Sequence, residues 1–243
     1  MIGILDLFEE ERLRWTPEEM MARLRCPRST LYRYLRVLAD AGLVTSLPDV
    51  GYTLGPRIAE LDYEMRSSDP LITNGRPVLQ ALVREVPGIG LLCRHYKGRV
   101  LCVHQEAGVN GIRSGYERGR GMPFARGAAS RVIHAHLKPA QLTALYAAQP
   151  REFRRTGMGA TLEQVQESLR RIRRQGYCVT HGEVTPGVTG IAAPVMDAEG
   201  SVIGSLSLTV PAAEVSPARL RALAKRVAFS AQVVTNSMRP AGT

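Results

Sequence analysis

The sequence contains no apolar run of the ~18 residues that a membrane-spanning helix needs, so we expect no membrane partner. Its opening residues, MIGILDLFEEERLRW, place acids directly after the apolar positions and include no small-residue cleavage site, which argues against a signal peptide. The four cysteines lie far apart, at positions 26, 93, 102 and 178. Without an export signal, these features favour reduced thiols and a cytoplasmic protein.

Acidic residues are the minority charge, with 22 Asp and Glu against 32 Lys and Arg, and the net charge of +10 favours a polyanionic partner. The excess is uneven. Residues 1–66 hold nine arginines and eleven acids, a net charge of −2, whereas residues 67–243 hold 23 bases and 11 acids, a net charge of +12. One window in the acidic part nevertheless contains no acid at all, from Met20 to Ala39. That local absence is the feature to explain.

Two short helices and a longer one are predicted in the first 42 residues. Apolar residues at helical spacing in residues 4–8 indicate the first. The second begins after Thr16, a favourable N-cap residue, with a proline at its first position and Glu19 completing a capping box. After the tight break RCPR, residues 27–42 form the third, which ends at a glycine. With a hairpin at 44–54, this order is typical of a winged helix-turn-helix.

The third helix has two unlike faces. Its predicted buried stripe consists of Leu31, Leu35 and Leu38, with Val37 and Ala41 as further candidates. The opposite face carries hydrogen-bond donors and positive charge, from Arg28, Ser29, Thr30, Tyr32, Arg33 and Arg36. A helix that enters the major groove needs such donors and excludes carboxylates from the phosphates. The acid-free window therefore predicts a DNA-reading helix, although a solvated basic face is the alternative.

From residue 70 onward, strands and helices alternate in an order that predicts an α+β domain with an antiparallel sheet and packed helices. Strands are expected on both sides of the Lys97-Gly98 turn, at 110–116, and in a hairpin spanning 187–210. Helices are expected at 76–86, 123–137, 139–148, 161–176 and 216–238. The length of the chain suits one small and one medium domain.

The segments STLYRYLRVLADAGLV and GYTLGPRIAEL resemble the winged helix of the IclR-type bacterial transcriptional regulators. GMPFARGAASRVIHAHL and GYCVTHGEVTPGVTGIAAPVMDAEGSVIGSLSLTVP resemble the family's GAF-like effector domain. The resemblance covers nearly the whole chain. It implies a DNA-binding domain at 1–55, a linker helix at 56–69, and an effector-binding and oligomerisation domain at 70–243.

By the same resemblance, an effector lies on the sheet, under the loop at 177–187 and a helix near 124–132. The positions that would face it are Phe124, Val132, Thr180, Gly190, Ser207 and Thr209. The hydroxyls of Ser207 and Thr209, two residues apart on one strand face, suit a carboxylate. Gly190 leaves room for a wider ligand, such as an aromatic acid. Nearby arginines, at 113, 118, 120 and 126, could neutralise the acid or form a basic surface loop.

Two other chemistries are weighed against this reading. A two-residue turn would place Cys93 opposite Cys102 and His104 opposite Leu91, with His95 on the same sheet face. Two thiols and two imidazoles could serve a metal- or thiol-redox-sensing regulator, although the four are strung along a flat face. Cys178 and His181 could be a nucleophile and a base, but no oxyanion hole is identifiable. We expect no catalytic role, no cofactor and no metal.

The sequence therefore predicts a regulator that binds double-stranded operator DNA and responds to a small carboxylic acid. Palindromic half-sites require two reading helices, so a homodimer or a dimer of dimers is expected.

Overall fold

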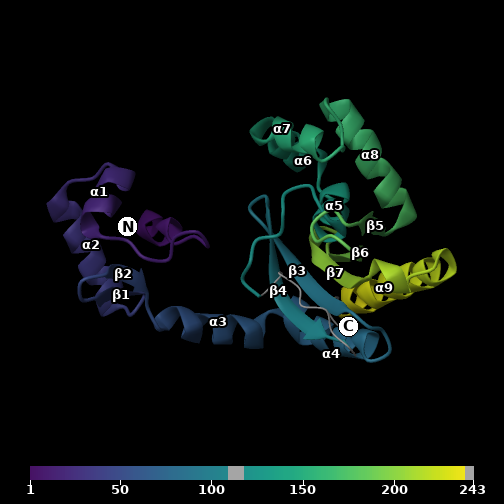
Figure 1. Cartoon of the computed structure of the whole chain (residues 1–243), viewed down its shortest axis with the longest axis horizontal. Coiled ribbons are helices and arrows are strands. Elements are labelled where there is room, and N and C mark those ends of the chain that lie inside the picture. The colour runs from purple at the N-terminus through teal and green to yellow at the C-terminus, as the bar shows by residue number, and fades with distance from the viewer. Residues whose placement is uncertain (109–117, 239–243) are drawn as a thin grey trace. The chain divides into compact units, whose positions relative to one another are not determined.

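The computed structural model describes residues 1–108 and 118–238 of the 243-residue chain. Two compact units divide it, Met1–Ser68 and Asp69–Thr243. Figure 1 labels the elements of both units. The strand predicted at 110–116 lies outside the described residues.

The N-terminal unit contains the predicted helices and hairpin. Its elements are η1 (Ile2–Leu7), α1 (Pro17–Leu24), α2 (Arg28–Asp40), β1 (Val44–Leu47), β2 (Gly51–Leu54) and α3 (Arg57–Ser68). The first element is a 3-10 helix rather than an α-helix. The capping box of α1 is confirmed: the Glu19 amide donates to Thr16 Oγ1 at 3.3 Å, and the Thr16 amide donates to Glu19 Oε2 at 3.0 Å. Both ends of α1's first turn are therefore fixed by side chains.

The core of this unit is the apolar stripe of α2 packed against its neighbours. Leu31, Leu35 and Leu38 are buried, together with Met20 of α1 and the ring of Trp15. Val37 and Ala41, the further candidates for that stripe, are exposed. The stripe is thus a single row of three leucines along the helix, one per turn. It leaves most of the α2 surface to solvent.

The hairpin β1–β2 is antiparallel, with Val44 opposite Leu54. Trp15 extends it, because its amide donates to Tyr52 O at 3.0 Å and accepts the Tyr52 amide at 2.8 Å through its carbonyl. Gly51 makes this approach possible. Its φ is +105°, and a Cβ there would stand 2.4 Å from Trp15 O. The linker helix α3 follows and has no buried residue.

The C-terminal unit is built on one five-stranded antiparallel sheet in the order β4-β3-β7-β6-β5. The strands are β3 (Ile89–Tyr96), β4 (Arg99–Ala107), β5 (Cys178–His181), β6 (Val188–Met196) and β7 (Val202–Pro211). The α+β fold class predicted from the sequence is confirmed.

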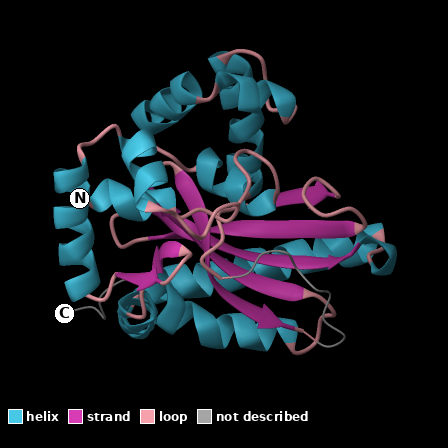
Figure 2. Cartoon of the chain, turned by 60° about the vertical axis from the view of Figure 1, so that its left-hand side comes forward, coloured by secondary structure: helices cyan, strands magenta, loops and turns pink. Residues whose placement is uncertain are grey.

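Helices cover both faces of this sheet (Figure 2). On one face α4 (Pro70–Val83) and α9 (Pro217–Ser237) pack over apolar side chains such as Leu206 and Leu208. On the other face α5 (Ala128–Ala135) packs over Leu91, Cys93 and Ala192. Beyond α5 lie α6 (Pro139–Ala148), α7 (Pro150–Arg155) and α8 (Leu162–Gln175), while η2 (Ala212–Glu214) precedes α9. The cavity described below lies on the α5 face.

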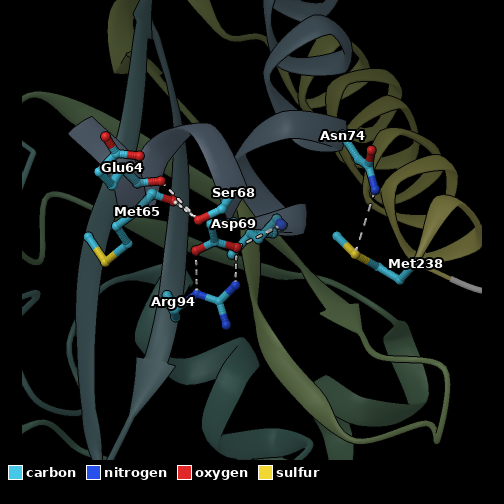
Figure 3. A network of polar contacts seen from close by, with 8 residues as sticks. Glu64, Met65, Ser68, Asp69, Asn74, Arg94 and Met238 are labelled. Carbon is cyan, nitrogen blue, oxygen red and sulfur yellow. Dashed lines mark hydrogen bonds and ion pairs between the residues drawn. The ribbon is translucent and has the colours of Figure 1, made fainter. Parts of the chain in front are cut away.

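A polar cluster fixes the start of α4 (Figure 3). Asp69 accepts the Leu71 amide at 2.9 Å, and its carboxylate also binds the guanidinium of Arg94 on β3. Further along α4, Asn74 Nδ2 donates to Ser237 O at 3.3 Å and lies 3.9 Å from Met238 Sδ. These contacts join α4 to the sheet and to α9.

Two helices differ in their bounds from the sequence predictions, and a third was not predicted. The helix expected at 76–86 begins at Pro70, because Asp69 caps it and a proline suits the first turn, and it continues through Pro77. The helix expected at 123–137 is restricted to Ala128–Ala135, because Ala125 and Gly127 have positive φ angles of 52° and 78°. The short helix α7 has no predicted counterpart.

Candidate functional site

The predicted DNA-reading face of α2 is largely exposed. Thr30 is half-buried, and the other five residues are open to solvent: Arg28, Ser29, Tyr32, Arg33 and Arg36. Arg28 lies over the Tyr32 ring, with 5.3 Å between its Cζ atom and the ring centroid. Arg36 Nε lies 4.0 Å from Asp40 Oδ2, with both side chains strongly exposed, so this ion pair is weak. The arginines of α2 are thus available to a polyanion.

The N-terminus of α2 adds backbone donors to this face. Its N-cap is Pro27, which provides no side-chain cap, and its first backbone hydrogen bond joins the Leu31 amide to Pro27 O. The amides of residues 28–30 consequently have no acceptor among the described residues. An uncapped helix N-terminus attracts phosphate. The wing differs in chemistry, because residues 43–56 contain no Lys or Arg and the wing turn carries Asp49.

A cavity of about 430 Å³, including space open to solvent, lies in the C-terminal unit. It is formed by β5, β6, β7, the start of α5 and the loop between β5 and β6. Four of the six predicted effector-facing residues line it: Thr180, Gly190, Ser207 and Thr209. Leu91, Met122, Val184 and Val188 add apolar surface. Its mostly apolar lining with a few polar groups is that of a small-molecule site.

Ser207 provides a buried polar group to the lining. The residue is 4% exposed, and its Oγ has no hydrogen-bond partner. The hydroxyl lies near Cys93, where it partly offsets the rise in the pKa of that thiol. A buried hydroxyl without a partner costs free energy that a bound acceptor would recover. Gly190 sets the width beside it, because a Cβ there would stand 3.1 Å from Thr180 Oγ1 and 3.7 Å from Ala128 Cβ.

The start of α5 also lines the cavity, through residues 127–129. No side chain caps this helix, and its first backbone hydrogen bond joins the Arg131 amide to Gly127 O. The amides of residues 128–130 therefore have no acceptor in the described part of the chain. In α1, α4, α8 and α9, by contrast, a side chain accepts from the first turn.

One ion pair joins the cavity lining to α5. Glu183, on the loop between β5 and β6, accepts the Gly127 amide through Oε2 at 3.0 Å and binds Arg131 Nη1 through Oε1 at 2.8 Å. Arg131 also donates to Ala125 O at 3.2 Å and to Thr156 O at 2.9 Å. Among the described residues, no Lys, Arg or His lines the cavity, and Glu183 is the one charged residue that does.

Phe124 and Val132, the other two residues predicted to face the effector, do not line this cavity. The Phe124 ring packs instead against Phe153 and His134, at centroid distances of 5.1 and 5.3 Å, in the cluster that joins α5 to α6–α8. Val132 is fully buried between α5 and the sheet. Residues 124–127 are not helical, so the helix presents its first residues to the cavity and not the positions expected.

The cysteine and histidine hairpin departs from its predicted register at one point. Cys93 lies opposite Cys102 and His95 opposite Val100, as predicted, but His104 lies opposite Leu92 and not Leu91. A β-bulge next to Cys93 inserts one residue, so His104 pairs with a residue that packs against α4, on the other face. There its Nε2 lies 2.8 Å from Glu106 Oε1. The four side chains therefore do not share a face.

The thiols of this hairpin are poor candidates for metal or redox chemistry. Burial raises the pKa of Cys93 well above its usual value, and the neighbouring Cys102 adds to the shift. Burial also raises the pKa of Cys102 to about 11. The reactive thiolate is therefore scarce at neutral pH. In the described part of the chain, no three His, Cys, Asp or Glu side chains are grouped to hold a metal ion.

Cys178 and His181 are likewise separated. Cys178 is buried, and desolvation raises its pKa to about 12, so its thiol is not an activated nucleophile. His181 lies three residues further along the strand, is exposed, and contacts Thr189 Oγ1 at 3.1 Å through Nδ1.

Sequence reasoning missed the pairing of Glu183 with Arg131 and the free amides of α5. Opposite charges in the two elements expected to enclose the ligand were a usable signal for the pair. The glycine before Ala128 was a signal for the uncapped helix, since glycine offers no capping side chain.

Comparison with known proteins agrees with these features. The chain matches the family model described as "Bacterial transcriptional regulator IclR C-terminal" over residues 64–236. It matches the model described as "IclR helix-turn-helix domain" over residues 2–48.

Individual relatives extend this comparison. The HTH-type transcriptional regulator BhcR of Paracoccus denitrificans is 28% identical over 230 residues, which cover 93% of this chain and 81% of BhcR. An IclR transcriptional regulator from Silicibacter sp. TM1040 superposes with a TM-score of 0.84 at 19% identity, over 99% of this chain and 96% of that one.

An IclR homologue from Microbacterium hydrocarbonoxydans, complexed with 4-hydroxybenzoate, superposes with a TM-score of 0.75 at 20% identity, over 98% and 96% of the two chains.

Across residues 1–108 and 118–238, no helix combines the length and apolar character needed to cross a membrane.

Proposed function

The chain belongs to the IclR family and is a DNA-binding transcriptional regulator, and on that premise we propose that a small organic acid bound in the C-terminal cavity changes its affinity for operator DNA. Its relatives are named as transcriptional regulators, so the protein is a regulator rather than an enzyme. The observation that carries the proposal is the buried, unpartnered hydroxyl of Ser207 in a cavity that also receives the uncapped start of α5.

A carboxylate is the ligand group that suits these donors. Hydroxyls of Thr180, Ser207 and Thr209 and the free amides at the start of α5 all donate hydrogen bonds, and a carboxylate accepts several at once. The helix dipole adds a favourable interaction with negative charge. The IclR homologue solved with 4-hydroxybenzoate is consistent with an acid of this class.

The width beside Gly190 favours an aromatic acid. The apolar side chains of Leu91, Met122 and Val188 provide a surface for a ring, and the missing side chain of Gly190 leaves space between Thr180 and Ala128. Phe124 and Val132, which lie outside the cavity, have no part in this proposal.

DNA recognition is assigned to α2. Arg28, Arg33 and Arg36 are proposed to bind phosphates or guanine edges, and Ser29, Thr30 and Tyr32 to donate to phosphates. The wing, which has no Lys or Arg and carries Asp49, would add little electrostatic attraction for DNA. Reading a palindromic operator requires two copies of α2, so the working form is proposed to be a homodimer or a dimer of dimers in the cytoplasm.

Transmission between the sites is proposed to be a population shift. The ligand prefers one arrangement of the domain at 70–243, and the linker at 56–69 carries that preference to the domain at 1–55. The linker helix α3 exposes apolar side chains at Leu61, Tyr63 and Met65. A helix of 12 residues without buried contacts is marginal alone, which favours a packing partner for it in the assembled regulator.

The test is fluorescence anisotropy of the DNA just upstream of the gene that encodes this protein, at two salt concentrations, with and without aliphatic and aromatic acids. We expect salt-dependent binding that one class of acid changes. Specific binding that no acid alters would refute the ligand proposal while leaving the regulator intact.

A further inference from the structure

The cavity proposed to accept an acid already contains a carboxylate. Glu183 lines it, and both of its oxygens are engaged, one by the Gly127 amide and the other by the guanidinium of Arg131. Gly127 is the N-cap residue of α5, so Glu183 occupies the outermost donor of the helix end that would attract a ligand anion. Ala128 and Ala129, whose amides have no acceptor among the described residues, line the same cavity as Ser207, whose hydroxyl has no partner.

A ligand carboxylate entering this site would meet the Glu183 carboxylate. Two carboxylates that share a site repel each other, and one of them must gain a proton or leave. Protonation would forfeit the ion pair between Glu183 and Arg131, whose side chains are only 25% and 16% exposed. Leaving a largely buried guanidinium without an anion is costly, whereas replacing one carboxylate by another keeps the pair.

We propose that Glu183 is an internal competitor for the effector: the ligand carboxylate displaces it from the Gly127 amide and from Arg131, and the loop at 182–187 opens. The proposal rests on the function proposed above. Arg131 would then supply the cation that the cavity otherwise lacks, because it becomes available to the ligand only when Glu183 leaves.

The loop is built to make this exchange. Gly182 and Gly187, at its two ends, have φ angles of +62° and +75°, and a Cβ at either would meet nothing within 4 Å. The ends stay joined to the sheet, because the Gly182 amide donates to Val188 O at 2.8 Å and the Ala212 amide donates to Gly187 O at 2.9 Å. Val184 is the loop's packing contact with the start of α5.

Arg131, in contrast, is held in place. Its Nε and Nη2 atoms donate to Ala125 O and Thr156 O, and these bonds do not involve Glu183. When Glu183 leaves, Nη1 therefore keeps its position and faces an incoming anion. Competition of this kind weakens binding of acids and selects for ligands that carry a carboxylate, since a neutral ligand cannot take the place of Glu183.

The first experiment compares wild type with Glu183→Gln by isothermal titration with benzoate and with benzamide, its neutral analogue. The glutamine side chain keeps an oxygen for the Gly127 amide but loses the charge that pairs with Arg131. We expect benzoate to bind Glu183→Gln about 10-fold more tightly than wild type, with benzamide unchanged. Glu199→Gln, an exposed substitution in the turn between β6 and β7, is the matched control and should change neither.

Equal or weaker benzoate binding by a folded Glu183→Gln would overturn the competitor role while leaving the proposed acid site standing. If benzoate and 4-hydroxybenzoate bind neither protein, the competitor role for aromatic acids and the aromatic preference of the cavity are both refuted. Hydrogen exchange of the wild type supplies a measurement without mutation. Saturating benzoate should increase exchange in residues 182–187, whereas decreased exchange would mean that the loop closes over the ligand with Glu183 still in place.

Discussion

The two units of the chain present their functional groups in opposite ways. The N-terminal unit displays long, charged side chains on an exposed helix face, with Arg28, Arg33 and Arg36 open to solvent. The C-terminal unit uses short hydroxyls and backbone amides inside a cavity, with Ser207 almost fully buried. A phosphate backbone is met at the surface by long-range attraction, whereas a small acid must be desolvated and held by directional hydrogen bonds.

Charge follows this contrast in an unexpected direction. Residues 1–66, which include the helix proposed to read DNA, have a net charge of −2, and residues 67–243 have a net charge of +12. The two helices proposed to contact ligands, α2 and α5, share one feature: both begin without a side-chain cap. Local placement of donors, rather than net charge, distinguishes the binding surfaces.

Filling the cavity should have the largest effect, because it should remove acid binding by the C-terminal unit and leave DNA binding by the N-terminal unit intact. Gly190→Val adds side-chain atoms where a Cβ would already stand 3.1 Å from Thr180 Oγ1. We expect acid binding to weaken about 100-fold, because overpacking the space beside Thr180 costs a few kcal/mol. Operator affinity without acid should stay at the wild-type value, as measured by anisotropy. An acid response equal to wild type would show that the ligand lies elsewhere.

Lowering the pH from 7 to 5 should destabilise the C-terminal unit only, because all five histidines lie in residues 69–243. Burial lowers the pKa of His134 to about 3, with nearby His95 adding to the shift. Below pH 6.5 the unfolded chain binds a proton there that the folded chain does not, so stability falls as the pH drops from 6.5 toward 3. At pH 5 the C-terminal unit should lose about 2 kcal/mol of unfolding free energy.

Trp15, the one tryptophan, reports on the N-terminal unit by fluorescence, while calorimetry follows both units. We expect the calorimetric transition of the C-terminal unit to move down between pH 7 and pH 5 and the fluorescence transition to stay. His134→Leu should reduce the pH dependence, because it removes the histidine whose pKa is lowered to about 3. A fluorescence transition that moves as far as the calorimetric one would contradict this division.

Arg33→Ala tests local against overall charge. We expect operator affinity to fall about 10- to 100-fold, since a direct arginine contact is worth roughly 1–3 kcal/mol, with acid binding unaffected. Arg170→Ala removes the same charge from the exposed face of α8 and should leave operator affinity within error. Equal losses in the two variants would mean that α2 contributes only general charge.

Ser207→Ala should give the smallest effect. One neutral hydrogen bond contributes about 0.5–1.5 kcal/mol, so we expect acid binding to weaken about 2- to 10-fold, measured by titration. Ser205→Ala is the matched control, because Ser205 is also buried without a partner on β7 but does not line the cavity. Identical behaviour of the two variants would remove Ser207 from the ligand contact.

Local patterns predicted the N-terminal unit well. The capping box at Thr16, the leucine stripe of α2 and the hairpin after it depend on contacts between residues close in sequence, and all three are present. The strand pairing of Cys93 with Cys102 was predictable for the same reason, because a two-residue turn sets it. The register beyond it was not, since nothing local marks the bulge that moves His104 to the other face.

The cavity shows the limit of such patterns. Alternation along β7 indicated that Ser207 and Thr209 share a face, and both line the cavity. Phe124 lies outside the cavity, because positive φ angles at Ala125 and Gly127 delay the start of α5 and the ring packs against Phe153. Helix starts of this kind depend on the contacts of the surrounding loop.

The sequence by itself determined the family, the α+β class, and the buried and exposed faces of α2, which follow from helical periodicity. Only the tertiary structure decided which polar groups meet in the cavity and which are left without a partner. Glu183 and Arg131 are 52 residues apart in sequence, and their contact depends on how α5 and the loop after β5 pack on the sheet. Short-range hydrogen bonds and periodicity are written in neighbouring residues, whereas the pairing of buried charges is set by packing between distant segments.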